Sequence, residues 1–154
     1  MHLPPLITTL LLAAATAPSP TLAKGINSAG MHCDGSILCG PIGQMTKPCR
    51  PAPLQQLKNE LERVDTTRFY RDHERIVCLG GTGLRDLCLY LKHTNGSTAE
   101  RFNYLVQELL DFGCRVCGGV PTDWPETNSV VEGELKANMV LNGCRKGGRG
   151  PGLC

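Results

Sequence analysis

The sequence predicts an α+β fold, with two helices packed on one face of an antiparallel sheet of about five strands that is held by disulfides. Apolar residues recur at helical spacing in two segments and alternate in others, in the order β-α-β-β-α-β-β. The chain has 9 cysteines in 154 residues, which is typical of secreted domains with modest cores. Because nine is odd, one thiol must stay free or pair between chains.

The N-terminal residues have the pattern of a secretory signal peptide. The apolar run from Leu6 to Ala15 is too short to span a bilayer, and Thr21-Leu22-Ala23 presents small residues before Lys24. We expect a signal peptide at 1–23, one domain at 24–144 and a flexible, basic, glycine-rich tail at 145–154. The protein is therefore expected to be secreted and extracellular, with no stable insertion in a membrane.

The first half of the domain should begin irregularly and then form a helix and two strands. Residues 25–53 are rich in glycine and proline, leaving room for a short strand at their start. A helix should begin at Pro53, since Leu54, Leu57, Leu61 and Val64 share one helical face. Strands are expected at 69–79 and 84–91, joined by a turn at Gly80–Gly83 into an antiparallel pair.

The second half should contain a helix followed by two strands. Asn95-Gly96-Ser97 is a glycosylation sequon, so Asn95 is a predicted glycosylation site on an exposed loop. Ser97 or Thr98 should cap a helix that runs through Phe112 and ends at Gly113. Extended chain at 115–120, a proline-rich loop around Trp124 and a last strand at 133–141 complete the expected elements.

Several motifs, in the same order, resemble the killer protein 4-like family of small secreted fungal killer toxins. They are Gly25-Ile26-Asn27, Cys33-Asp34-Gly35-Ser36 through Cys39-Gly40, Asp86-Leu87-Cys88-Leu89-Tyr90-Leu91, Phe112-Gly113-Cys114-Arg115-Val116-Cys117-Gly118, and Gly133-Glu134-Leu135 followed by Cys144. The chain departs from the family in an insertion at 28–32, in Lys136-Ala137-Asn138-Met139, where the family favours Thr-Val-Asn-Tyr, and in its tail with Cys154.

The resemblance implies how the cysteines pair. It joins Cys33 to Cys114, Cys39 to Cys117 and Cys78 to Cys144, and Cys49 with Cys88 then follows by elimination. Cys154 is left over, so the protein is expected to be a monomer that can form a covalent dimer through Cys154.

Two chemical alternatives use the same cysteines. Cys114 and Cys117 with His32 and Cys33 have residue types that bind zinc, and Cys114-x-x-Cys117 has the spacing of a redox dithiol. We favour disulfides, because the motif follows a helix instead of opening one and an oxidising compartment is expected. No metal or other cofactor is predicted.

The sequence offers no catalytic constellation that stands out. His73 between Asp72 and Glu74 is the best candidate for acid–base chemistry, but in a strand only the two carboxylates would share a face. His93 has no predicted partner, and Gly80–Gly83 lacks the lysine of a phosphate loop. The formal net charge of +2 gives no reason to expect nucleic-acid binding. We therefore predict a protein that is not an enzyme.

The resemblance implies a toxin that inhibits the growth of competing or host cells, by blocking a calcium channel at the cell surface. The predicted contacts with that partner are Arg71, Arg75 and Arg85, which would flank the glycine turn, together with Lys92 on the next loop. The simpler interpretation is that these charges only keep the sheet soluble. An apoplastic effector or cell-wall interaction protein without channel activity is the alternative function, and an extracellular hydrolase is a third.

Overall fold

The computed structural model describes residues 30–39, 52–80 and 85–144. The predicted signal peptide, the Gly25 start, Cys49, turn residues 81–84 and the tail with Cys154 lie outside these ranges. Within them the elements are η1 (Ile37–Cys39), α2 (Pro53–Leu61), β1 (Phe69–Tyr70), β2 (Arg75–Gly80), β3 (Arg85–Lys92), β4 (Ser97–Thr98), α3 (Phe102–Asp111), β5 (Gly118–Pro121) and β6 (Glu134–Leu141).

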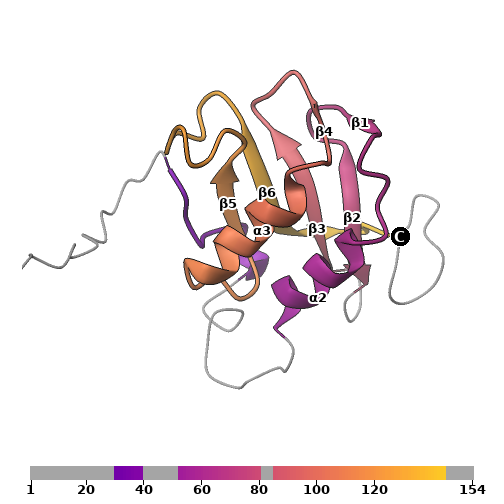
Figure 1. Ribbon diagram of the computed structural model, residues 1–154. Coiled ribbons are helices and arrows are strands. Elements are labelled where there is room, and N and C mark those ends of the chain that lie inside the picture. Colours follow the sequence, from indigo (N-terminus) through magenta and orange to yellow (C-terminus); the bar gives the residue numbers. More distant parts are fainter. Residues whose placement is uncertain (1–29, 40–51, 81–84, 145–154) are drawn as a thin grey trace, which may run out of the picture.

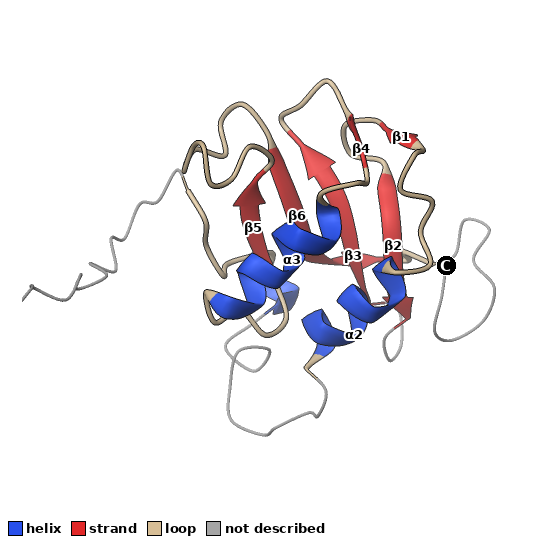
Figure 2. Cartoon of the chain, in the orientation of Figure 1, coloured by secondary structure: helices blue, strands red, loops and turns tan. Residues whose placement is uncertain are grey.

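The described strands form a four-stranded antiparallel sheet in the order β2-β3-β6-β5 and a small sheet of β1 and β4. Both helices cover the same face of the larger sheet (Figure 1), with α2 over β2 and β3 and α3 beside β5. Coloured by secondary structure, the molecule shows one layer of helix on one layer of sheet (Figure 2). The predicted α+β class is confirmed.

The core lies between the helices and the sheet. The leucines of α2 predicted to share a face, Leu54, Leu57 and Leu61, are all buried, as is the apolar face of α3. Leu87, Leu89 and Leu91 of β3 alternate toward this core, as a half-buried strand requires. Neither described helix has the length and hydropathy needed to cross a membrane.

Two predicted elements differ from the structure. Ser97 and Thr98 do not cap a helix but form β4, where Ser97 pairs with Tyr70 and Thr98 with Phe69. Helix α3 begins at Phe102 without a side-chain cap, because the candidate capping residues are used in strand pairing. The strand predicted at 69–79 is interrupted, since His73 has φ of 59°, a left-handed conformation that a strand cannot contain. Gly113 ends α3 with φ of 106°, as expected of a helix stop.

The described residues contain three complete disulfides. Two of them, Cys33–Cys114 and Cys39–Cys117, are the pairs that the resemblance implies. The third joins Cys78 to Cys88, so the pairs Cys78–Cys144 and Cys49–Cys88 were wrong. The reason is the register, which places Cys78 and Cys88 directly opposite each other in β2 and β3. Cys144 is also disulfide-bonded.

Candidate functional site

The face of the large sheet opposite the helices is polar. In β6, Leu135 and Ala137 point into the core, so Glu134, Lys136 and Asn138 point the other way. The residues opposite them in β3 include Lys92, Tyr90 and Cys88. We call this surface the polar face. Because its side chains come from adjacent strands in fixed register, their relative positions are set by the sheet.

Residues 30–39 are attached to the polar face at the β5 side of the sheet. The backbone N–H of His32 donates to Gly119 O at 3.0 Å, and the N–H of Gly119 donates to His32 O at 2.8 Å. The N–H of Ser36 donates to Asn138 Oδ1 at 2.7 Å. Two disulfides fasten the same segment to residues 114 and 117. Backbone pairing and covalent bonds therefore fix where the side chains of His32 and Asp34 lie.

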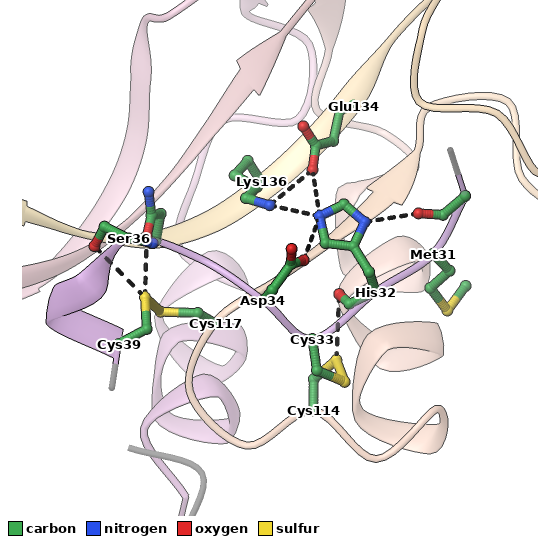
Figure 3. Close-up of polar contacts among 12 residues, drawn as sticks. Met31, His32, Cys33, Asp34, Ser36, Cys39, Cys114, Cys117, Glu134 and Lys136 are labelled. Atoms are coloured by element: carbon green, nitrogen blue, oxygen red, sulfur yellow. Dashed lines mark hydrogen bonds and ion pairs between the residues drawn. A yellow bond between two sulfur atoms is a disulfide. The ribbon is translucent and has the colours of Figure 1, made fainter. Parts of the chain in front are cut away.

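Four titratable side chains converge where this segment crosses β6 (Figure 3). Nε2 of His32 lies 2.9 Å from Asp34 Oδ1, 3.2 Å from Glu134 Oε1 and 2.6 Å from Lys136 Nζ. Lys136 Nζ also lies 3.1 Å from Glu134 Oε1. We call this group the His32 cluster. It is a network of close polar contacts centred on one imidazole nitrogen, and it includes the ion pair of Lys136 with Glu134.

The cluster is buried unevenly. The side chain of Glu134 is 3% exposed and that of Lys136 10%, whereas that of Asp34 is 81% exposed. Burial, the largest influence on Glu134, raises its pKa, but the close contact with His32 and the charge of Lys136 outweigh it. The pKa of Glu134 therefore lies below its ordinary value, and the carboxylate stays ionised at neutral pH.

Replacing Glu134 with glutamine should make the protein less sensitive to acid. A carboxyl with a lowered pKa in the folded state stabilises the fold above its unfolded pKa, near 4.5, and loses that contribution as pH falls through the folded value. At neutral pH the variant should be less stable by about 2 kcal/mol, the size of a hydrogen bond to a charged group. Urea unfolding between about pH 7 and about pH 3 should show this difference shrinking on acidification. A constant difference over that range would contradict the role assigned to the carboxylate.

The predicted contact residues do not form a single basic edge around the glycine turn. In the β2–β3 hairpin, Arg75 pairs with Tyr90 and Gly80 pairs with Asp86. Arg85 therefore lies at the turn end, and Arg75 lies at the opposite end near Lys92. The expectation that Arg75 flanks the turn was wrong, because a strand of this length separates the two. Lys92 closes β3 instead of lying on a loop.

Arg71 belongs to the end of the hairpin that carries Arg75 and Lys92. A parallel bridge between Asp72 and Leu91 places the two chain segments side by side there. We call Arg71, Arg75 and Lys92 the basic end of the hairpin. The guanidinium of Arg75 also donates to Gly143 O at 2.8 Å, so its side chain extends along the sheet toward the turn end, where Leu141 of β6 pairs with Arg85.

The histidines considered for catalysis have other surroundings. The ring of His73 stacks against Tyr90 with centroids 6.3 Å apart, and its Nε2 lies 3.6 Å from Asp72 Oδ2. Glu74 is instead paired with Arg68. His93, which was expected to lack a partner, places Nδ1 3.3 Å from Val130 O.

The zinc and dithiol alternatives are overturned. Cys33, Cys114 and Cys117 are all bonded in disulfides and have no thiolate to offer. In the part of the chain that the structure describes, no three histidine, cysteine or acidic side chains are arranged to hold a metal ion.

Asn95 is exposed between β3 and β4, and Gly96 follows it with φ of 107°. The side chain is therefore accessible, and glycosylation at Asn95 stays a prediction.

The His32 cluster was not predicted from the sequence. His32 and Lys136 are 104 residues apart, and no local motif joins them. The available signal was in β6, where two charged residues alternate with the apolar Leu135 and Ala137. That pattern marks a polar face, but it does not indicate which segment crosses it.

Comparison with known protein families gives a match. A sequence model of the Kp4 family matches residues 11–141, which include nearly all of the described part of the chain. No curated protein sequence matches this chain.

Proposed function

We propose, because this chain belongs to the Kp4 (killer protein 4) family, that it is secreted and inhibits the growth of competing or host cells by blocking a calcium channel at their surface. The observation that carries the proposal is the family match over 11–141, which makes the chain killer-toxin-like. Its mode of action is binding and not catalysis. A cytotoxic binding protein of this kind needs a rigid frame and exposed charges that reach its partner.

The frame supports the proposal. Two disulfides and the pairing of residue 32 with β5 join the N-terminal segment to the sheet, and a third disulfide joins β2 to β3. A frame that is already ordered loses little conformational entropy when it binds, so more of the contact energy is available for affinity.

The basic end of the hairpin is the proposed contact. Arg71 and Arg75 are exposed there, and Lys92 is partly exposed. The mouth of a cation channel attracts positive charge, so cations held on a rigid strand end suit it. Arg85 is also exposed but lies at the other end of the same hairpin. It therefore provides a matched control.

Growth inhibition of a panel of fungi by the purified protein tests the proposal. If the target is a calcium channel, added extracellular calcium should relieve the inhibition. Inhibition that calcium leaves unchanged would contradict the channel target, and no inhibition at any dose would favour a secreted effector or cell-wall interaction protein without channel activity.

Arg75→Gln or Lys92→Gln should reduce potency by about tenfold, or about 1.4 kcal/mol of binding free energy. Arg85→Gln should leave potency unchanged, because its side chain lies at the opposite end of β3. The circular dichroism of all three variants should match that of the unmodified protein. Equal potency of all three variants would move the contact elsewhere, and a loss confined to Arg85→Gln would place it at the turn.

A further inference from the structure

One nitrogen of the His32 ring has a fixed proton and the other does not. Nδ1 lies 2.7 Å from the carbonyl oxygen of Gly30. A carbonyl only accepts hydrogen bonds, so Nδ1 carries a hydrogen whether the ring is neutral or charged. Nε2 therefore presents a lone pair in the neutral ring and an N–H in the imidazolium.

The neighbours of Nε2 require opposite protonation states. The ammonium of Lys136, 2.6 Å away, can only donate, so this contact needs the lone pair. The ionised carboxylates of Asp34 and Glu134, at 2.9 and 3.2 Å, can only accept, so these contacts need the N–H. The two sets of hydrogen bonds exclude each other. Protonation of His32 must exchange the ammonium for a carboxylate.

Protonation of the ring changes the summed charge of the cluster. With a neutral ring, the two carboxylates and one ammonium of the cluster sum to −1, and protonation brings the sum to zero. The pKa of Glu134 lies below its ordinary value, so its carboxylate remains charged while an imidazole titrates. From the other strands, Lys92 of β3 pairs in register with Glu134, and β5 contributes Gly119 without a charge.

The exchange changes the position of Lys136. An imidazolium and an ammonium repel at 2.6 Å, so the amine must move away from Nε2. While Lys136 contacts Nε2 of His32, its side chain is 10% exposed. Its partner in the adjacent strand is Tyr90, which also pairs with Arg75. A lysine that leaves the ring therefore joins the cations at the basic end of the hairpin.

Few carboxylates are left on this face to hold the released amine. Asp34 is exposed but binds the imidazolium, and Asp86 is buried and accepts from the N–H of Cys144 at 3.0 Å. Glu134 holds the amine at 3.1 Å only in the position that lies 2.6 Å from Nε2, which the charged ring excludes. The complement of such a face is a surface that presents carboxylates.

We propose that acidification, by protonating His32, turns the Lys136 ammonium out of the cluster so that the polar face binds a carboxylate-rich protein surface. The proposal rests on the proposed function in taking the basic end of the hairpin, which shares Lys92 with this face, as part of the contact surface. The exchange at Nε2 and the binding of carboxylates are properties of the chain alone.

The test uses the full-length secreted protein and a poly-glutamate peptide as probe. Nuclear magnetic resonance should show the Lys136 side-chain signals shifting with the same midpoint as the His32 ring. Binding of the peptide should be about threefold tighter at about pH 5.5 than at about pH 8, the size of one exposed ion pair.

Two variants separate His32 from the other imidazole of this face. His32→Asn keeps a donor near the Gly30 carbonyl but cannot titrate, and should bind the peptide equally at both pH values. His73→Asn removes the ring stacked on Tyr90 and should retain the pH dependence. If peptide binding by His32→Asn still depended fully on pH, or if binding by His73→Asn no longer did, the proposal would be overturned.

A third variant guards against misfolding of His32→Asn. Lys136→Gln removes the amine and should bind weakly at both pH values, and tight binding by it in acid would overturn the proposal. The proposal would also be overturned if the Lys136 signals of the unmodified protein did not shift with the same midpoint as those of His32. Peptide binding that depends on pH without any growth inhibition would contradict the channel function and leave the His32 exchange standing.

Discussion

Removal of both Cys33–Cys114 and Cys39–Cys117 should lower the free energy of unfolding by about 7 kcal/mol, whereas removal of either bridge alone should lower it by only about 3 kcal/mol. The cysteines of these bridges are separated by 81 and 78 residues in sequence. In the chain-entropy model, a closed loop of that length stabilises a protein by about 4.5 kcal/mol. The two bridges do not each supply this amount.

The bridges are parallel, so the second adds less than the first. Once Cys33 is bonded to Cys114, the other bond closes only the short spans 33–39 and 114–117, a loop of roughly ten residues worth about 2.7 kcal/mol. The same holds in the reverse order. Either bridge alone therefore keeps the long closure, and the two effects are strongly non-additive.

Urea unfolding of three variants measures this, with alanine in place of each cysteine because a buried hydroxyl would add its own cost. The control is the removal of Cys78–Cys88, whose cysteines are only 10 residues apart and which should cost about 3 kcal/mol. If the costs of the two single removals add up to the cost of the double removal, the bridges do not share one closure. All measurements need non-reducing conditions.

The sequence predicted the elements whose signals are local. Helix α2 follows from the spacing of Leu54, Leu57 and Leu61, and β3 follows from the alternation of Leu87, Leu89 and Leu91. Both signals arise because each element buries one face against the same core.

Predictions from the sequence were wrong where residues distant in the chain determine the local structure or the disulfide partner. Ser97 and Thr98 are good capping residues, yet pairing with β1 satisfies their backbone groups first. Cys88 was assigned by elimination, but the register of β2 and β3 sets it opposite Cys78. The candidate site depends even more on distant partners, since His32 meets Glu134 and Lys136 only through the crossing of two segments.

Substitution of Gly119 by alanine should destabilise the protein by about 3 kcal/mol, because it forces a methyl group into the buried part of the His32 cluster. Gly119 lies in β5 opposite Lys136 and faces the cluster. A Cβ at this position would overlap Glu134 Oε1 and lie 2.8 Å from His32 Cε1. Real Cβ atoms essentially never approach other atoms so closely.

Neither neighbour has room to move. Glu134 is buried and held by Lys136 at 3.1 Å, so displacing its carboxylate would break an ion pair away from water. His32 is held by two backbone hydrogen bonds to Gly119 itself and by the disulfide of the next residue. The strain must therefore separate residues 30–34 from β5 or expel the carboxylate.

A double-mutant cycle with Glu134→Ala identifies the source of the strain. Truncating Glu134 removes the carboxylate that the new methyl group would strike, so Gly119→Ala should cost only about 1 kcal/mol in that background, the remainder coming from His32. Urea unfolding of the four proteins at neutral pH gives the coupling energy. Equal costs of Gly119→Ala in the two backgrounds would show that the glycine is required for strand pairing and not for space beside the carboxylate. A large coupling would show that the absence of a Cβ atom at this position of β5 allows the chain to bury Glu134 against His32 and Lys136.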